Sequence, residues 1–405
     1  MKIVFYENQS ISRLYPIAYT RPAFDIFCGA ATLYQVVAEI FKAPIDYFVR
    51  PEILNTTAKK FPANKSFSEN ILYLDASLIP AFNSALELLS LIKEKKQCLI
   101  KNQDKIIGFY ASEPGLEIAT LIKTEFKSVE NGFESVNINW PIMNYCWETI
   151  IFNQKILHAN LTYLKNQYQE FKPGVFVGQD VTLPENAVFE TSEGIIIIDD
   201  YTKILPFTYL AGPIYIGKNC LIKEFASIKS NCCFGSVCKV GGEVEATIIQ
   251  GYANKQHYGF LGHSYLGEWI NIAAGTSNSD LKNTYSNIRI GGVETGQQFL
   301  GTVIGDFSRT AINTSIFTGR IIGVSSFVYG TITRDIVSFS NYAAHLGCVI
   351  VLDLPVAIKA QQSMFARRSR EQTTVDTDLL AQVFEATREE RNKQDICPGK
   401  LEFKI

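Results

Sequence analysis

One segment in the second half of the chain combines residues that are suited to acid–base chemistry with residues that leave room for a ligand. His257 begins this segment, which continues through Asn271 and the small pair Ala274-Gly275 to Thr276. A histidine titrates near neutral pH, so His257 could remove the proton that an amine loses when it attacks a carbonyl group. A lone histidine is more often an ordinary loop residue, and the surrounding pattern decides between the two interpretations.

The chain around this segment repeats with a period of six residues. One register holds large apolar residues, and the register two residues earlier holds small or apolar ones. A helix has a period of 3.6 and a plain strand has a period of 2, so neither produces this repeat. The repeating residues are Ile216, Ile222, Ile228, Phe234 and Val240; Ile214, Cys220, Ala226, Cys232, Cys238 and Val244; and Ile304, Thr310, Ile316, Ile322 and Val328.

A six-residue period predicts a triangular coil in which each hexad supplies one short strand and one corner. Three hexads then complete a turn of about eighteen residues, and successive turns stack about 4.8 Å apart. Glycines such as Gly217 and Gly235 follow the large apolar residue, where we expect the corner to need unusual backbone angles. The period breaks at 252–260 and 277–298, and such insertions often build the ligand site of a solenoid. A β-sandwich is the alternative, but it would not hold one register over five consecutive hexads.

The first half of the chain predicts a different kind of domain. Short apolar strands alternate with amphipathic helices, which is typical of an α/β domain around a mostly parallel sheet. We therefore divide the chain into an α/β domain (1–150), a linker helix (151–172), the coil (173–345) and a C-terminal tail with a helix (346–405). The expected elements are strands at Lys2–Tyr6, Ile71–Leu74 and Ile106–Tyr110, and helices at Thr32–Lys42, Phe82–Ile92, Trp147–Gln169 and Ser369–Asn392.

Composition limits the possible functions. The 405 residues are 47% hydrophobic and 19% charged, with a formal net charge of -2, which indicates a soluble globular protein and argues against nucleic-acid binding. No stretch resembles a secretory signal or a membrane span, so a cytoplasmic location is expected. The nine cysteines are expected to be reduced, with Cys232, Cys233 and Cys238 in the core rather than on a metal.

The segment that begins at His257 resembles the acetyltransferase half of the bifunctional N-acetylglucosamine-1-phosphate uridyltransferase/glucosamine-1-phosphate acetyltransferase family. That family carries the pattern His-x-x-Tyr-Leu-Gly-Asp-x-x-Ile-Gly-x-x-x-Asn-Ile-Gly-Ala-Gly-Thr. The spacing is preserved without a gap from His257 through Leu261-Gly262, Leu266-Gly267 and Asn271-Ile272 to Ala274-Gly275-Thr276.

The resemblance implies a left-handed parallel β-helix of the hexapeptide-repeat type, assembled as a homotrimer. It also implies that His257 is the general base and that Asn271, Ala274 and Gly275 line the groove for an amino sugar and acetyl-CoA. Lys255 and Lys282 could supply charge to the acceptor, and Arg367-Arg368 could contact the CoA phosphates, although each is also a common surface residue.

The same segment departs from the family in ways that affect the acceptor. Phe260 replaces a tyrosine that contacts the sugar, and His263 replaces an aspartate. Ser279–Lys282 stands where the family has Asn-Tyr-Asp-Gly, and the stretch Glu245–Ile249 lacks the expected lysine pair. The acceptor is therefore not expected to be glucosamine 1-phosphate bound in the familiar way.

A second resemblance lies near the beginning of the chain. Ser12–Pro22 looks like the signature of sugar-phosphate nucleotidyltransferases, in which Arg13 and Arg21-Pro22 match. The approach to it has no glycine, and Ala23 replaces the signature lysine, so this domain is expected to be degenerate. The whole layout resembles an uncharacterised bacterial group of sugar nucleotidyltransferases with a hexapeptide-repeat C-terminal domain.

Three functions remain in view from the sequence. The first is acetyl-CoA-dependent N-acetylation of an amino-sugar phosphate or a sugar nucleotide, with His257 as the base. The second is sugar-1-phosphate nucleotidyl transfer that uses Arg13, Arg21 and Asp25 with Mg²⁺. The third is a non-catalytic paralogue that binds a sugar nucleotide.

Overall fold

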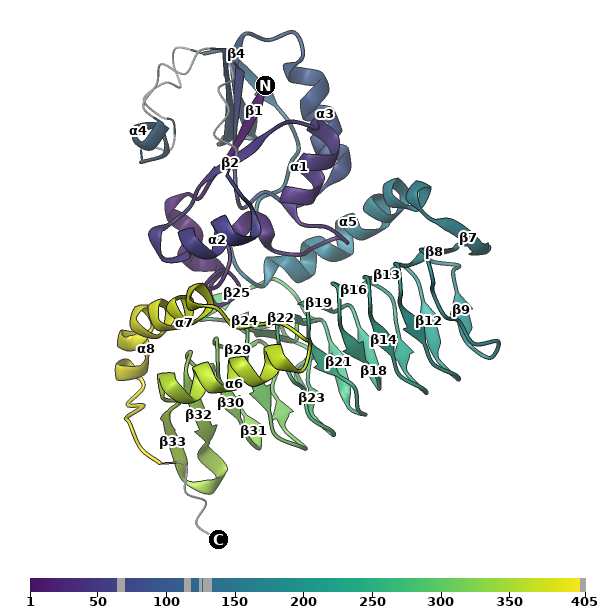
Figure 1. Ribbon diagram of the computed structural model, residues 1–405, viewed down its shortest axis with the longest axis vertical. Coiled ribbons are helices and arrows are strands. Elements are labelled where there is room, and N and C mark those ends of the chain that lie inside the picture. The colour runs from purple at the N-terminus through teal and green to yellow at the C-terminus, as the bar shows by residue number, and fades with distance from the viewer. Residues whose placement is uncertain (64–69, 113–117, 124–125, 127–132, 401–405) are drawn as a thin grey trace.

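The computed structural model describes residues 1–63, 70–112, 118–123, 126 and 133–400. An α/β domain stands on one side of a long triangular coil, and three helices from the end of the chain pack along that coil (Figure 1).

The α/β domain contains a six-stranded sheet with the order β2-β1-β3-β5-β4-β6. Three of the pairings are parallel, but β5 runs antiparallel to both of its neighbours, so the sheet is mixed. The alternation of strands and helices did not predict this, because β4 and β5 form a hairpin across Gln103 and Asp104, and so short a connection permits only antiparallel pairing. The strands are β1 (Lys2–Tyr6), β2 (Ile45–Phe48), β3 (Asn70–Asp75), β4 (Gln97–Asn102), β5 (Lys105–Ser112) and β6 (Ser135–Asn137).

The helices of this domain are α1 (Leu33–Phe41), α2 (Leu54–Lys60), α3 (Phe82–Ile92), α4 (Ile118–Lys123) and α5 (Glu148–Leu164). The sequence places α1, α3 and α5 correctly, although the last is shorter than expected. Helix α5 connects the domain to the coil through a buried asparagine. The side chain of Asn153 accepts from the backbone N–H of Gly29 at 2.8 Å and donates to the carbonyl of Asn231 at 2.9 Å.

The second half forms a left-handed parallel β-helix with three faces. Its turns repeat regularly, since Ile196 pairs with Ile214 and Ile214 pairs with Cys232, which is a step of 18 residues each time.

The strands of each face follow one another at this interval. The first face contains β8 (Val175–Val177), β10 (Ile196–Ile198), β13 (Ile214–Ile216), β16 (Cys232–Phe234), β19 (Ile248–Gly251), β22 (Tyr265–Glu268), β26 (Thr302–Ile304) and β29 (Arg320–Ile322), with β7 (Gln169–Lys172) at its edge. The second contains β11 (Lys203–Ile204), β14 (Leu221–Ile222), β17 (Lys239–Val240), β20 (Asn254–Lys255), β27 (Arg309–Thr310), β30 (Phe327–Val328), β32 (Ser340–Ala343) and β33 (Cys348–Val351). The third contains β9 (Val188–Glu190), β12 (Tyr209–Ala211), β15 (Ser227–Ile228), β18 (Glu243–Glu245), β21 (Phe260–Gly262), β23 (Ser277–Asn278), β28 (Ser315–Ile316) and β31 (Thr331–Ile332).

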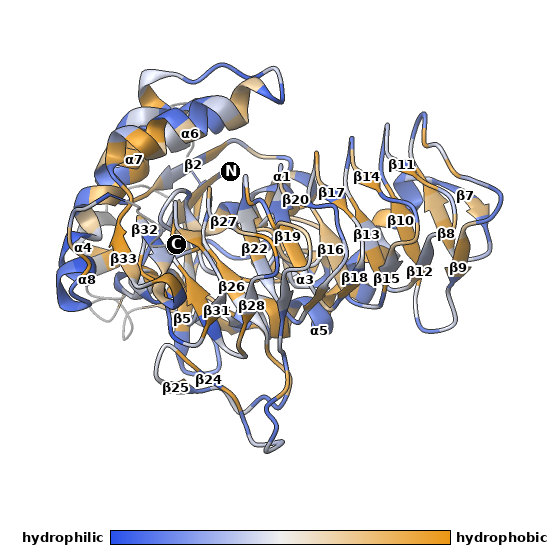
Figure 2. Cartoon of the chain, turned by 90° about the horizontal axis from the view of Figure 1, so that it is seen from below, coloured by the Kyte–Doolittle hydropathy of each residue, from blue (hydrophilic) through white to orange (hydrophobic). Residues whose placement is uncertain are grey.

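The predicted six-residue registers form the core of this β-helix. All the members of the two main registers, including Cys220, Cys232 and Cys238, are buried, and these cysteines are free thiols. The break at 277–298 is an excursion that carries the antiparallel hairpin of β24 (Arg289–Ile290) and β25 (Val293–Glu294) and projects from the coil (Figure 2).

The role expected for the repeat glycines is wrong. The left-handed backbone at the corners belongs mostly to residues with side chains, such as Phe207, Asn219 and Phe225, whereas Gly217 and Gly235 are not among the positive-φ residues. Glycine is needed at these two positions because the next turn is too close. A Cβ on Gly217 would lie 2.8 Å from the carbonyl oxygen of Phe234.

The end of the chain also differs from the prediction. Instead of one helix over 369–392, it forms α6 (Leu354–Ala366), α7 (Thr374–Ala386) and α8 (Arg388–Lys393). Helix α6 packs on a corner of the β-helix through Phe365, whose ring centroid lies 4.6 Å from that of Trp269. Among the described residues, the helices are too short or too polar to cross a bilayer.

Candidate functional site

His257 lies at a corner of the β-helix, between β20 on the second face and β21 on the third, and its side chain is exposed. The next turn packs directly against this corner, because the N–H of Gly275 donates to the carbonyl of Tyr258 at 3.1 Å. The turn after it contributes Asn313, which accepts from the hydroxyl of Tyr258 at 3.4 Å. The structure therefore brings His257 and the Ala274-Gly275 segment into one accessible corner.

Lys255 occupies a position that the sequence did not predict for it. Instead of facing a ligand, it lies inside the prism with 1% of its surface exposed, in the column of Ile204, Ile222 and Val240. Its ammonium donates to the carbonyls of Gly241 at 2.8 Å, His257 at 2.7 Å and Gly259 at 2.7 Å.

Lys255 therefore holds the backbone on both sides of the exposed corner from within. Burial lowers its pKa to about 8. Lys282, the other lysine expected near the acceptor, is exposed and donates to the carbonyl of Asn287 at 2.6 Å.

Asn271 lies on the outside of the second face, in register with Asn254 and Arg309 on the neighbouring turns. Together with the end of α6 these residues line a small pocket, which we call the cationic pocket. Its volume is about 90 Å³, which suits one phosphate-sized group. It is lined by Tyr252, Asn254, Trp269, Asn271, Arg309, Met364, Arg367 and Arg368.

The cationic pocket is electrostatically unbalanced. Three arginines line it, and none of the lining residues carries a carboxylate. Burial, together with repulsion from Arg367, lowers the pKa of Arg309 and of Arg368, and burial followed by the same arginine pair lowers the pKa of Lys239 nearby.

The donors in this pocket are also incompletely satisfied. Arg368 donates to the side chain of Asn254 at 2.8 Å, but its Nε and the Nε of Arg309 are buried without a hydrogen-bond partner. Concentrated positive charge with unsatisfied N–H groups is what a phosphate ester would neutralise.

A second histidine has the geometry of an oriented base, and sequence analysis did not single it out as one. The Nδ1 atom of His263 lies 2.8 Å from the carboxylate of Asp280, and its ring packs against Phe299. A carboxylate on one ring nitrogen fixes the tautomer and leaves the other nitrogen available. The separation of 17 residues could have revealed the pair, because it matches the local repeat from Ile248 to Tyr265.

The nucleotidyltransferase-like segment contacts the β-helix. Arg21 is buried and forms an ion pair with Asp306, which also accepts from the hydroxyl of Thr20 at 2.6 Å. The same guanidinium lies 3.4 Å from Glu268 and 3.9 Å from Asp25. Arg21 and Asp25 thus meet, but they do so in a cluster that joins the two domains.

Arg13, the third residue of this set, lies apart from the cluster. It is exposed, and its guanidinium stacks on the ring of Tyr145 at 5.6 Å. The two carboxylate oxygens of Asp25 lie 2.9 and 2.7 Å from the ammonium of Lys60, so they offer no free donor set to a cation. Across the described ranges, no three His, Cys, Asp or Glu side chains group in a way that could hold a metal ion. The expected Mg²⁺ site does not fit these residues.

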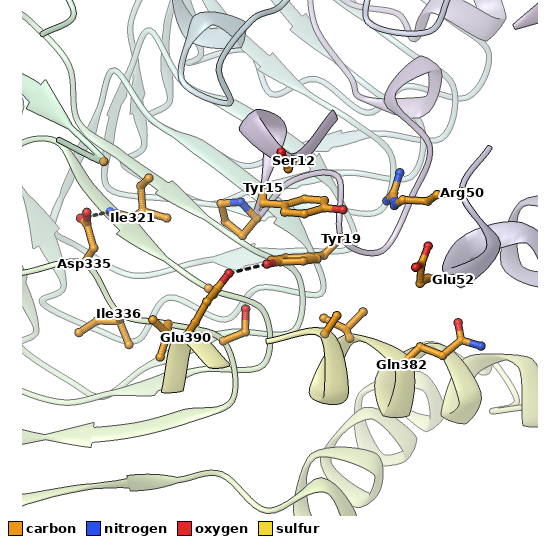
Figure 3. Close-up of a pocket in the computed structure, with 17 residues that line it drawn as sticks. Ser12, Tyr15, Tyr19, Arg50, Glu52, Ile321, Asp335, Ile336, Gln382 and Glu390 are labelled. Carbon is orange, nitrogen blue, oxygen red and sulfur yellow. Dashed lines mark hydrogen bonds between the residues drawn. The ribbon is translucent and has the colours of Figure 1, made fainter. Parts of the chain in front are cut away.

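The largest cavity, of about 630 Å³, lies where the nucleotidyltransferase-like segment meets the end of the β-helix and α7 (Figure 3). Tyr15 and Tyr19 stack on each other at 3.8 Å in its wall, and Tyr19 donates to Glu390 at 2.8 Å. Its one lining cation is Arg50, which is already paired with Glu7 at 2.6 Å. Glu52, Asp335 and Glu390 line it as well, so the cavity does not suit a triphosphate.

Comparison with known proteins confirms both resemblances. Residues 3–169 match the sugar nucleotidyl transferase family. The bifunctional protein GlmU of Methanococcus aeolicus is 28% identical over 264 residues, which cover 61% of this chain and 59% of that protein. The GlmU protein of a Buchnera aphidicola strain is 29% identical over 145 residues, which cover 34% of this chain and 28% of that protein. The chain therefore spans less than two thirds of these curated relatives.

Solved structures of acyltransferases also resemble the chain. One is the Arabidopsis UDP-N-acetylglucosamine acyltransferase, with 10% identity and a TM-score of 0.26 over 56% of this chain and 89% of that one. Another is AntD, an N-acyltransferase from Bacillus cereus in complex with dTDP and coenzyme A, with 15% identity and a TM-score of 0.19 over 40% of this chain and 76% of that one. At these values the likeness carries no information about substrates.

Proposed function

We propose that the chain is an acetyl-CoA-dependent N-acetyltransferase that acts on an amino-sugar phosphate or a sugar nucleotide. The observation that carries this proposal is the cationic pocket, whose unpaired arginines lie on the same outer face of the β-helix as the strand that leads to His257.

The spacing between this pocket and His257 suits a long, phosphate-bearing donor. Asn254 lines the pocket, and His257 follows three residues later at the corner. An extended backbone rises about 3.3 Å per residue, so the two lie roughly 10 Å apart along the chain. When it is bound, acetyl-CoA supplies an activated acetyl group on a thioester, and Arg309, Arg367 and Arg368 would hold its phosphates.

The remaining residues have defined tasks in this reaction. The amine nitrogen of the acceptor attacks the thioester carbonyl, His257 takes the proton that the amine loses, and the thiol leaves as the carbon–sulfur bond breaks. Lys255 fixes the carbonyls of His257 and Gly259 and so positions the corner. Ala274 and Gly275 keep the neighbouring turn small beside the acceptor, and Asn271 offers an amide to it.

A threefold assembly would complete this site. Exposed apolar side chains follow the corner that carries His257, and 72% of Phe225 is exposed even though its ring stacks on that of Phe207 at 5.3 Å. Tyr258 and Ile312 continue this row beside the site. A neighbouring subunit would cover these side chains and exclude water from the acceptor.

Acetyl transfer measured with a panel of amino sugars, their 1-phosphates and their nucleotide derivatives tests the proposal. The wild-type chain should release CoA with at least one of these acceptors, and His257→Ala should lower kcat by about 10²–10⁴-fold, the range for losing a general base. His263→Ala is the matched control because it removes another corner histidine. Loss of activity in His263→Ala with normal activity in His257→Ala would move the base to the His263–Asp280 pair, and no transfer to any acceptor would refute the function.

The nucleotidyltransferase alternative has weaker support. Arg13 does not meet Arg21 and Asp25, and the carboxylates near Arg21 are paired with cations. A non-catalytic paralogue would bind acetyl-CoA or a sugar nucleotide without turnover, and the same assay distinguishes it.

A further inference from the structure

A second cleft lies on the opposite side of α6 from the cationic pocket, where the α/β domain, the β-helix and α7 meet. It consists of two adjoining cavities of about 280 and 270 Å³. Both cavities are lined by Asp25, Lys60, Phe61, Tyr252 and Glu268, so they form one continuous space that we call the junction cleft. We propose that the junction cleft binds the ring of a sugar, in addition to the acyl-transfer site.

Two buried polar atoms that line the junction cleft lack a partner. The Nε of Arg21 and the Oγ1 of Thr57 are buried without a hydrogen bond, in side chains that belong to residues only 4% and 1% exposed. Buried donors are rarely left unsatisfied, because each has lost its hydrogen bonds to water. Arg21 spends its other nitrogens on Asp306 and Glu268. A hydroxyl group of a ligand could accept from Nε and also pair with the threonine hydroxyl.

The charge of the junction cleft favours a hydroxyl-rich ligand over a bare anion. Four cations line its larger cavity, Arg21, Lys59, Lys60 and Arg370, and four carboxylates balance them, Asp25, Glu268, Asp306 and Asp376. This differs from the cationic pocket, which has no carboxylate in its lining. The Glu268 carboxylate remains 22% exposed beside Arg21, so it can accept a hydrogen bond from a hydroxyl group while Arg21 donates one.

The wall of the junction cleft is aromatic. The rings of Tyr252 and Trp269 stack at 4.4 Å, and Phe61 lines the opposite, α/β-domain side. Planar apolar walls with a few convergent polar groups are typical of sites for small ligands. A sugar ring offers both requirements, since its C–H face can pack on an aromatic ring while its hydroxyls reach the charged floor.

The junction cleft is separate from the acyl-transfer site but shares a wall with it. Tyr252 and Trp269 line both the junction cleft and the cationic pocket. His257 and the Ala274-Gly275 corner line neither of the two cavities that make up the cleft. A sugar in the junction cleft and acetyl-CoA in the cationic pocket can therefore bind at the same time.

Calorimetric titration of the full chain tests this inference with pairs of probes that differ by a sugar ring. UDP-glucose is compared with UDP, glucose 1-phosphate with inorganic phosphate, and free N-acetylglucosamine is added alone, each up to 20 mM. At least one sugar-bearing probe should bind at least about tenfold more tightly than its sugar-free partner. Equal binding within both pairs, together with no binding of N-acetylglucosamine, would overturn the proposal.

Two threonine variants locate the binding and separate it from a structural effect. Thr57→Val removes the unsatisfied hydroxyl, so it should weaken binding of the sugar probe about fivefold to tenfold without lowering the melting temperature. Thr149→Val is the control, because Thr149 is also buried but its hydroxyl donates to the carbonyl of Cys146 at 2.8 Å. That variant should lower the melting temperature and leave the affinity unchanged.

The outcome does not depend on acetyl transfer. Wild-type affinity in Thr57→Val, or a melting temperature that falls with it, would refute the assignment of the hydroxyl to a ligand. The sugar probe should bind equally well to His257→Ala, so failure of the acyl-transfer proposal and failure of this one give different results.

Discussion

Lys255 allows a quantitative test of how the corner at His257 is held. It is the one charged residue in a column of core positions that otherwise contains Ile204, Ile222 and Val240. Replacing it with methionine keeps most of the volume but removes the donor to three carbonyls. Those carbonyls would become buried and unsatisfied, so Lys255→Met should destabilise the protein and loosen the corner at neutral pH.

The pH dependence of this effect follows from the lowered pKa. Burial brings the pKa of Lys255 from 10.5 to about 8, so between these values the unfolded chain binds a proton that the folded chain does not. The free energy of unfolding therefore rises with pH in this window, and the cost of burying the charge, fully present below pH 8, disappears above 10.5. A shift of this size corresponds to at most about 3 kcal/mol.

Urea unfolding followed by tryptophan fluorescence between pH 7 and 10.5 measures the effect. The difference between wild type and Lys255→Met cancels the titration of groups that the two proteins share. The wild type should gain stability relative to the variant as pH rises, with a steepest slope of about 1.4 kcal/mol per pH unit. A difference that is independent of pH, or that shrinks as pH rises, would refute a buried ammonium at this position.

Three further substitutions test other parts of the structure. Asp306→Asn should leave the buried guanidinium of Arg21 without its main partner and cost about 3 kcal/mol in urea unfolding, and a loss below about 0.5 kcal/mol would mean that the cluster does not hold the domains together. Gly217→Ala should cost about 1–3 kcal/mol, because its Cβ would press on the carbonyl of Phe234, and an unchanged melting temperature would contradict that contact. Asp280→Asn should release the ring of His263 without lowering acetyl transfer if His257 is the base, and a loss comparable to that of His257→Ala would contradict this assignment.

The coil was predictable because its determinants are local. A six-residue period specifies which side chains enter the prism, and the structure buries those side chains from Ile214 to Val244. The corners were harder, because their left-handed backbone is imposed by closure of each turn and is adopted even by Phe207 and Phe225. Helix α6 was missed because its weakly amphipathic sequence becomes helical against an existing corner of the β-helix, where Phe365 meets Trp269.

The candidate site was only partly predictable, for a related reason. The His257 segment carries its own spacing and can be recognised within twenty residues. The cationic pocket joins Arg368 to Asn254, which is 114 residues away, and the domain junction joins Arg21 to Asp306, which is 285 residues away. No local pattern encodes such pairs. Arg21 therefore looked like a nucleotide-binding residue, whereas the structure uses it between the domains.

The proposed function depends most directly on whether the cationic pocket holds the phosphates of acetyl-CoA. Calorimetric titration of the full chain with acetyl-CoA, in wild type and in Arg368→Gln, tests this. We expect micromolar binding by the wild type, about tenfold weaker binding by Arg368→Gln, and a weakening by added salt that is smaller in the variant. Absence of binding to the wild type, or equal binding by the two proteins at every salt concentration, would contradict the account.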